Sequence, residues 1–117
     1  MTQEDKDLLV TDLCARLPYR TKLDTLDGPQ ELSTKWLAIN MCNIASPYLP
    51  YLIPLSSMTE EQRIEYSYLH SIIFSCFEDG LCEAIAKLNE WLNKNHFDYR
   101  GLIDKGLAIE APKGMYN

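Results

Sequence analysis

Side chains that could do chemistry gather most densely between Asn95 and Arg100. A catalytic interpretation takes a base, a carboxylate to orient it and a cation from His96, Asp98 and Arg100, with Tyr99 beside them. A structural interpretation makes this segment a helix cap and a docking turn. His96 would then lie on the helix dipole, Asp98 and Arg100 would be local hydrogen-bond partners, and Phe97 and Tyr99 would fill the core. The sequence favours the structural interpretation and assigns no catalytic residue.

The rest of the chain carries no catalytic or cofactor-binding motif. It has no G-x-S-x-G, P-loop, H-E-x-x-H or dinucleotide-binding fingerprint, so no cofactor is expected. No two cysteines have C-x-x-C spacing, and only two histidines could join them as zinc ligands, so no metal site is expected. We expect reduced thiols that pack as small apolar side chains at Cys14, Cys42, Cys76 and Cys82.

A second candidate site is a stripe of serines in an uncharged run. Residues Tyr66 to Phe77 contain no charged side chain, which is typical of a helix covered on more than one side. The stripe has the helical spacing i, i+4, i+8 and consists of Ser67, Ser71 and Ser75. Small residues in a row let another helix approach closely, so the run is either the central element of the fold or a homodimer interface. The alternative is that the serines simply face water.

Composition indicates one globular domain over residues 1–117, with 46% hydrophobic and 24% charged residues. The net charge is −6 and the basic residues are scattered, so nucleic-acid binding is not expected, although an acidic surface could mimic nucleic acid. The first residues are too polar for a signal peptide, and the weakly polar run from Ala45 to Leu55 is too short to span a bilayer. We therefore expect a cytoplasmic protein with no membrane partner.

Three helices are predicted from apolar periodicity and capping residues. The first covers Gln3 to Arg16, because Thr2 and Asp5 form a capping-box pattern and Pro18 ends the helix. The second covers Thr59 to Phe77, with Ser57 or Thr59 as the N-cap. The third covers Leu81 to Lys94, where apolar residues recur at i, i+4, i+7 and i+11.

The remaining segments predict an α+β fold. Residues 20–44 contain alternating patterns that indicate two or three short antiparallel strands around the Asp27-Gly28-Pro29 turn. Residues 35–44 also suit a helix, and both interpretations stay open. Three prolines make Ala45 to Leu55 an extended strap, neither a helix nor a central strand. The apolar tail after Phe97 is expected to pack back on the domain as a short turn or strand.

Three segments together resemble a family of small uncharacterised proteins encoded in gut bacteria and their phages or mobile elements. They are LCARLPY at 13–19, the segment Pro47 to Gln62 with PLSSMTEE at 54–61, and the segment Trp91 to Tyr116 with HFDYRGLI at 96–103. The middle of the chain, residues 21–46, departs from the family pattern. The resemblance implies a bacterial or phage cytoplasmic setting, and it carries over no activity and no site residue.

These observations favour a non-catalytic interaction or accessory protein of bacterial mobile-element or phage origin, whose protein partner the sequence does not identify. Two alternatives remain, a small enzyme that uses His96, Asp98 and Arg100, and an acidic inhibitor that mimics nucleic acid. A broad exposed apolar patch would favour the interaction protein. A deep pocket around His96 would favour the enzyme, and a clustered acidic face would favour the mimic.

Overall fold

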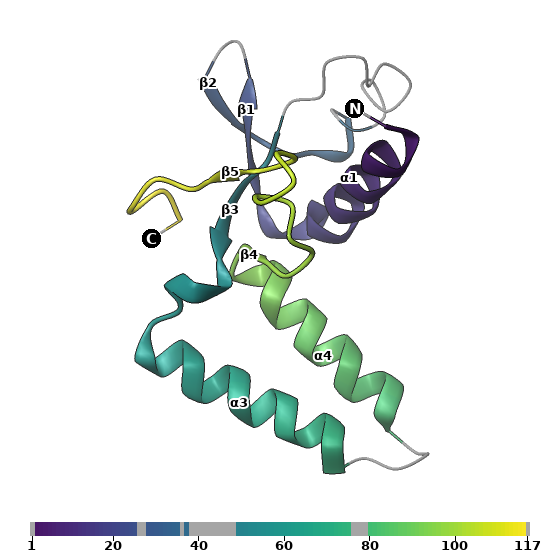
Figure 1. Ribbon diagram of the computed structural model, residues 1–117, viewed down its shortest axis with the longest axis vertical. Coiled ribbons are helices and arrows are strands. Elements are labelled where there is room, and N and C mark those ends of the chain that lie inside the picture. Colours follow the sequence, from purple (N-terminus) through teal and green to yellow (C-terminus); the bar gives the residue numbers. More distant parts are fainter. Residues whose placement is uncertain (1, 26–27, 36, 38–48, 76–79, 117) are drawn as a thin grey trace.

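The structure is a computed structural model that describes residues 2–25, 28–35, 37, 49–75 and 80–116. Its helices are α1 (Gln3–Arg16), α3 (Glu60–Ser75) and α4 (Leu81–Lys94), with short 3-10 turns η1 (Leu17–Tyr19) and η3 (Leu55–Ser57). Its strands are β1 (Lys22–Thr25), β2 (Gly28–Glu31), β3 (Tyr51–Pro54), β4 (Phe97–Asp98) and β5 (Ile109–Glu110). Helices and two small sheets share the chain, which confirms the α+β prediction (Figure 1).

The three helices form where their caps and periodicity predict them. The side chain of Thr2 accepts the Asp5 N–H while Asp5 accepts the Thr2 N–H, so α1 begins with a complete capping box. Thr59 and Gln62 exchange the same pair of bonds at the start of α3, which identifies Thr59 as its N-cap. The described part of α3 ends at Ser75, and the predicted last residues 76–77 lie outside the described residues.

The predicted antiparallel sheet is a hairpin of β1 and β2. Lys22 pairs with Glu31 at its open end and Thr25 pairs with Gly28 at the turn. Gly28 has a φ of 93°, a conformation that glycine adopts without strain. Beyond the hairpin, the Leu37 N–H donates to the Ser33 carbonyl at 3.0 Å, a helical bond, so the start of the 35–44 segment is helical. The strand-or-helix prediction for 38–44 lies outside the described residues.

One prediction about the proline-rich strap is wrong, because β3 is the central strand of a parallel sheet with the order β4-β3-β5. Pro50 precedes the strand and Pro54 is its last residue, paired with Asp98, and both are compatible with this position because each ladder is only two residues long. Ile53 supplies the N–H that bonds the His96 carbonyl at 2.8 Å. Pro50 takes part only as an acceptor, from the Ile109 N–H at 2.9 Å, so its missing N–H leaves no bond unmade.

The buried core forms three clusters that follow this topology. One joins α1 to β1 through Leu9, Leu13 and Leu23. A second lies under β3 and the C-terminal tail, where Leu52 meets Leu102 and Leu107. These contacts confirm that the tail packs back on the domain. The third cluster joins α4 to β4 around a fully buried Phe97, and one face of α3 contacts it with Tyr66, Leu69 and Ile73.

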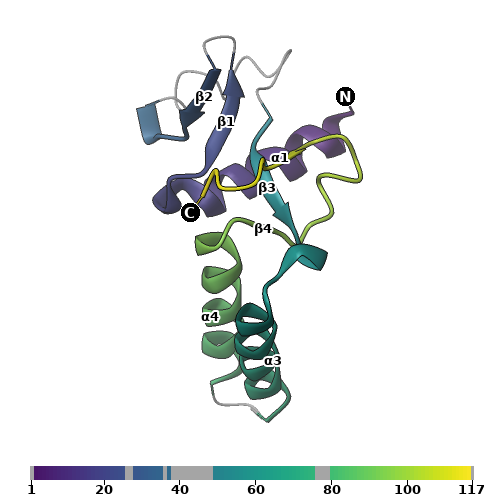
Figure 2. The same ribbon diagram turned by 90° about the vertical axis from the view of Figure 1, so that its left-hand side faces the viewer.

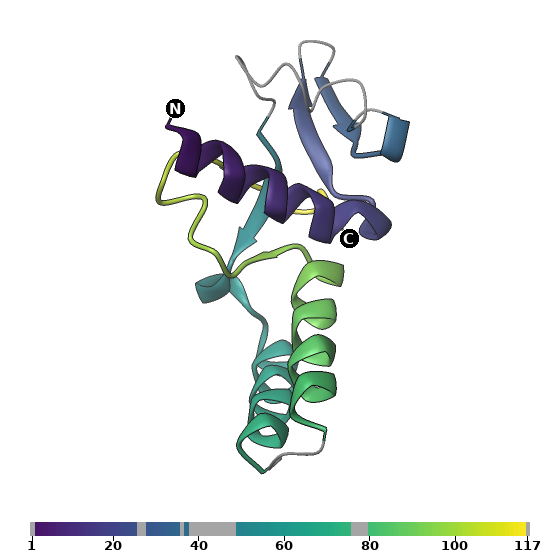
Figure 3. The ribbon, with the colours of Figure 1, turned by 90° about the vertical axis from the view of Figure 1, so that its right-hand side faces the viewer.

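Helices α3 and α4 form a hairpin that projects from the rest of the molecule. They lie next to each other and extend away from α1 and the β1–β2 hairpin in three views (Figures 1, 2 and 3). The molecule measures 44 × 31 × 24 Å, with a radius of gyration of 15.2 Å. A compact domain of this length would have a radius of about 13 Å. The projecting hairpin therefore gives the protein an elongated shape.

The position of α3 corrects another expectation. A helix with an uncharged second half was predicted to be covered on more than one side, yet none of the described residues of α3 is buried. Its inner face touches α4, and its outer face is open to solvent within a single chain. Helix α3 is therefore not the central element of the fold. None of the helices among the described residues is long and apolar enough to cross a membrane.

Candidate functional site

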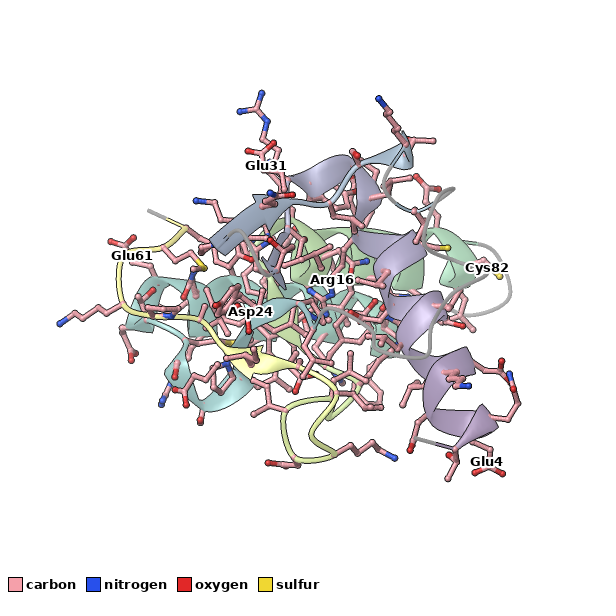
Figure 4. The ribbon with its side chains drawn as sticks, turned by 90° about the horizontal axis from the view of Figure 1, so that it is seen from above. Glu4, Arg16, Asp24, Glu31, Glu61 and Cys82 are labelled. Carbon is pink, nitrogen blue, oxygen red and sulfur yellow. The ribbon has the colours of Figure 1, made fainter. Side chains whose placement is uncertain are left out.

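The polar centre of the molecule begins with two residues of α1. Asp12 and Arg16 stand at i and i+4, on the side of the helix that also carries Leu9 and Leu13. The Arg16 Nε donates to the Asp12 Oδ2 at 2.8 Å, and both side chains are completely buried. Figure 4 shows Arg16 near the middle of the projection, whereas Glu4 and Cys82 lie toward its margin. A buried pair of this kind depends on further hydrogen bonds to offset its lost hydration.

Those further bonds come from the segment that follows α4. Arg100 places its Nη1 2.8 Å from the Asp12 Oδ1, so the carboxylate holds one guanidinium on each oxygen. The Arg16 Nη2 donates to the carbonyl of Phe97 at 2.7 Å. The buried Nη1 of Arg16 has no partner among the described residues. The network therefore joins α1 to the chain at Phe97 and Arg100 through charge-assisted hydrogen bonds.

Tyr99 completes the ionic network from one side. The Arg16 guanidinium carbon lies 5.4 Å from the centre of the Tyr99 ring, and that of Arg100 lies 4.7 Å away. Both distances suit a cation–π contact. The Tyr99 hydroxyl donates to the Asn93 Oδ1 at 3.0 Å, which ties the ring to the last turn of α4. We call Asp12, Arg16, Tyr99 and Arg100 the ionic network.

Asp98 has a separate and local role. Its two carboxylate oxygens accept the backbone N–H groups of Leu102 and Ile103, each at 2.9 Å. The carboxylate thus closes the turn that carries Arg100 toward α1. Asp98 and Tyr99 also line an open cavity of about 500 Å³ together with Asp104 and Glu110. Among the described residues, no group of three or more His, Cys, Asp or Glu side chains is placed to hold a metal ion.

His96 lies on the other side of β4, against the C-terminal tail. Its backbone has a φ of 63°, which ends α4 and turns the chain into β4. The ring stacks on Tyr116 with centroids 3.7 Å apart, and its Nδ1 lies 3.3 Å from the Thr21 Oγ1. Burial lowers the pKa of His96 from 6.5 to about 4, and the positive charge of Arg16 contributes to this shift. His96 is therefore neutral near pH 7, so it does not serve as the helix-terminal cation that the sequence predicted.

Tyr116 fastens the tail to two other segments. Its hydroxyl accepts the Lys22 N–H at 2.9 Å and donates to the Tyr51 carbonyl at 2.7 Å. Burial raises the pKa of Tyr116 to about 12. The phenol therefore keeps its proton and can hold both bonds at once across the ordinary pH range.

The structure brings part of the predicted site together and separates the rest. His96, Asp98, Tyr99 and Arg100 lie in one segment, but among the described residues no hydrogen bond or ion pair joins His96 to Asp98 or to Arg100. His96 contacts Thr21 and Tyr116, Asp98 bonds locally, and Tyr99 and Arg100 belong to the ionic network. The three serines lie on the exposed face of α3. There the Ser71 Oγ donates to the Tyr68 carbonyl, and the Ser75 Oγ donates to the Ile72 carbonyl.

Sequence reasoning missed the α1 half of the network. An Asp and an Arg at i and i+4 usually form an exposed ion pair, so this spacing alone does not predict a buried site. Their position on the apolar face that carries Leu9 and Leu13 was the signal, because a charged residue on a buried face needs a partner. Arg100 is that additional partner.

The cysteine prediction is only partly met. Cys14 and Cys82 are free thiols, but both are exposed and do not pack as small core side chains. Cys14 is on the outer face of α1, and Cys82 is in the first turn of α4. The predictions for Cys42 and Cys76 lie outside the described residues.

The fold and the site define a small α+β domain that is held together by a buried ionic network and extended by a helical hairpin. Comparison of the chain with protein-family models, with curated proteins and with solved structures gave no match.

The buried histidine predicts a pH-dependent stability. The unfolded chain takes up the His96 proton below pH 6.5, but the native state resists protonation until about pH 4. Stability should therefore fall as the pH is lowered through this window. From 6.5 to about 4 the loss is about 3 kcal/mol, because a tenfold change in proton affinity corresponds to about 1.4 kcal/mol.

The measurement is urea unfolding of the wild type and of His96→Asn across this pH range. Asparagine tolerates a positive φ, so the variant keeps the helix end while it removes the titrating ring. The variant should be less stable near pH 7 and should show a flatter pH dependence, since the remaining carboxyl groups titrate in both proteins. Parallel curves for the two proteins would contradict the assignment.

Proposed function

We propose that this chain is a non-catalytic interaction or accessory protein of the bacterial or phage cytoplasm, in which the α3–α4 hairpin is the docking element. One observation carries the proposal: α3 spans sixteen residues without a single buried one, and it leaves large apolar side chains in solvent. The exposed fractions are 65% for Ile64, 64% for Tyr68 and 79% for Phe74. Apolar side chains gathered on one element indicate an interaction site.

The geometry of the polar centre supports the same proposal. His96 is neutral near pH 7 and stacked, and both oxygens of Asp98 bind backbone N–H groups. Arg100 is paired with Asp12. These contacts explain the whole segment as a connection between α4, α1 and the tail. The enzyme alternative would instead need a base and its partners in contact with one another.

The distribution of charge favours an interaction protein over an acidic mimic. Glu4, Glu31 and Glu61 lie in separate regions near the margin of the molecule (Figure 4). They belong to α1, β2 and α3, so these carboxylates do not form one acidic face. The resemblance of residues 13–19, 54–61 and 96–103 to small proteins of gut bacteria and their phages supports the bacterial setting.

The experiment compares three tagged forms of the full chain in a bacterial host. They are the wild type, Phe74→Ser on α3 and Leu55→Ser on η3. Leu55 is also an exposed large apolar residue, but it lies outside the helical hairpin, so Leu55→Ser is the matched control. Quantitative mass spectrometry measures each co-purified protein, including a second copy of this chain with a different tag.

We expect at least one partner that Leu55→Ser retains and that Phe74→Ser loses by about tenfold or more, as for a central interface residue. Both substitutions change exposed positions, so stability should stay within about 0.5 kcal/mol of the wild type. Equal recovery of every partner by all three forms would refute the hairpin as the docking element.

A further inference from the structure

The exposed residues of α3 have a regular spacing that favours another helix as their partner. Four of these residues recur at i, i+4, i+7 and i+11, and two further residues lie beside this row on two of the turns. This spacing is typical of a helix–helix seam. We call these residues the outer seam, and they are Ile64, Ser67, Tyr68, Ser71, Phe74 and Ser75. The opposite face of α3 carries Tyr66, Leu69 and Ile73, which pack toward α4.

We infer that the occupant of the outer seam is a second copy of the same chain, with the two α3 helices antiparallel about a two-fold axis. This inference rests on the proposed function, since it names the partner of the same hairpin. A two-fold axis near the middle of α3 sets large side chains against small ones. Two pairs lie directly opposite each other, Ile64 with the partner's Ser75 and Tyr68 with the partner's Ser71, and Phe74 then lies within two residues of the partner's Ser67. A surface that complements itself in this way is what a symmetric dimer requires.

The serines are suited to burial in such a seam. The Ser71 hydroxyl donates to the Tyr68 carbonyl at 2.7 Å, and the Ser75 hydroxyl donates to the Ile72 carbonyl at 2.9 Å. The protons of these two hydroxyls are thus satisfied within their own helix, so a covering helix leaves neither of them without an acceptor. These two residues act as small, hydrogen-bonded surfaces on which a large side chain can lie.

Charge also favours the antiparallel arrangement. All six outer-seam positions are uncharged, so pairing buries no ion. The acidic first turn of α3 contains Glu60 and Glu61. An antiparallel pair places the two acidic turns at opposite ends of the seam, about 24 Å apart for a helix of sixteen residues. A parallel pair would bring these like charges together.

The available apolar area fits a weak dimer. An aromatic side chain buries about 150–250 Å² when fully covered. The exposed parts of Tyr68 and Phe74, together with Ile64, would therefore supply about 300–500 Å² per protomer. A standard interface buries about 800 Å² per partner, so the seam with its helix flanks forms a small interface that responds to concentration.

The test is sedimentation velocity of the purified full chain over a wide concentration range. The wild type should shift from monomer to dimer as concentration rises. Tyr68→Glu places a charge in the seam and should weaken the dimer by at least about tenfold. Leu55→Glu introduces the same residue at an exposed apolar position away from α3 and should leave association unchanged. Circular dichroism verifies that both variants remain folded.

A swap of sizes tests the antiparallel register. Tyr68→Ser alone removes the large member of a pair, and Ser71→Tyr alone sets two tyrosines against each other. The double variant restores one large and one small side chain in each pair, so it should recover the wild-type dissociation constant to within about threefold. A wild type that stays monomeric, a dimer that survives Tyr68→Glu, or a double variant no better than the single ones would overturn the inference. If dimerisation fails while a different protein still depends on Phe74 in the host, the proposed function stands without its dimer.

Discussion

Replacing Asp12 with asparagine is expected to lower the free energy of unfolding by about 3–5 kcal/mol, the usual cost of removing one member of a buried ion pair. Asp12 is the only carboxylate paired with Arg16 and Arg100 among the described residues. Its neutral isostere keeps the shape but leaves two guanidinium groups close together without a counter-charge. Arg16 is the more affected because it is completely buried and cannot turn to solvent.

Glu83→Gln provides a matched control for this prediction. Glu83 also pairs at i and i+4, with Lys87 at 3.5 Å, but both side chains are largely exposed. The same carboxylate-to-amide change should therefore cost less than about 1 kcal/mol. Urea unfolding of both variants gives the comparison, and equal losses would show that the network does not support the fold. Asp12→Leu combined with Arg16→Met should recover much of the stability, because apolar residues can replace a buried pair.

Truncation of Phe97 to alanine should cost about 3–5 kcal/mol, the range for a large aromatic residue removed from a core. Phe97 is completely buried, and its ring stacks on Trp91 with centroids 5.6 Å apart. It packs with Leu88 and Leu92 of α4 and with Met58. The cavity would open between α4, β3 and α3, whose side chains form this cluster.

The same substitution at Phe74 is the control. Phe74 is 79% exposed, so Phe74→Ala should change the stability of the monomer by less than about 0.5 kcal/mol. Thermal and urea unfolding at low protein concentration separate this effect from any association through α3. A Phe97 variant that is as stable as the Phe74 variant would show that β4 is not anchored by its aromatic side chain.

The helices were predictable because their signals are local. The Thr2–Asp5 capping box and the apolar spacing of α4 lie within a few turns of the residues that they organise. The parallel sheet was not predictable in this way. Its strands β4 and β5 have only two residues each, too few to show an alternating pattern, and their partner β3 follows Pro50 and ends at Pro54. The pairing is decided by tertiary packing, which local propensity does not encode.

The contacts of the candidate site were likewise predictable where they are local and not where they join distant segments. The segment from His96 to Arg100 was recognised from its composition, and Phe97 is buried as the structural interpretation predicted. Asp98 bonds locally, also as predicted, whereas Arg100 reaches Asp12 in α1. A sequence shows which residues carry charge, but only the fold shows which distant charge each one meets. The exposure of the outer face of α3 was likewise not predicted, since an uncharged helix is usually a covered one.

The ionic network also affects the order in which parts of the chain can fold during synthesis on a ribosome. The bond from Arg16 to the Phe97 carbonyl spans 81 residues, and the pair between Asp12 and Arg100 spans 88. Helix α1 is synthesised first, so its charged side chains remain hydrated until those partners have appeared. The contacts of the α3–α4 hairpin, including those to Met58 and Phe97, span shorter stretches of the chain, and contacts of shorter range form faster. A nascent chain can thus form its projecting arm before the ionic network of its body can close.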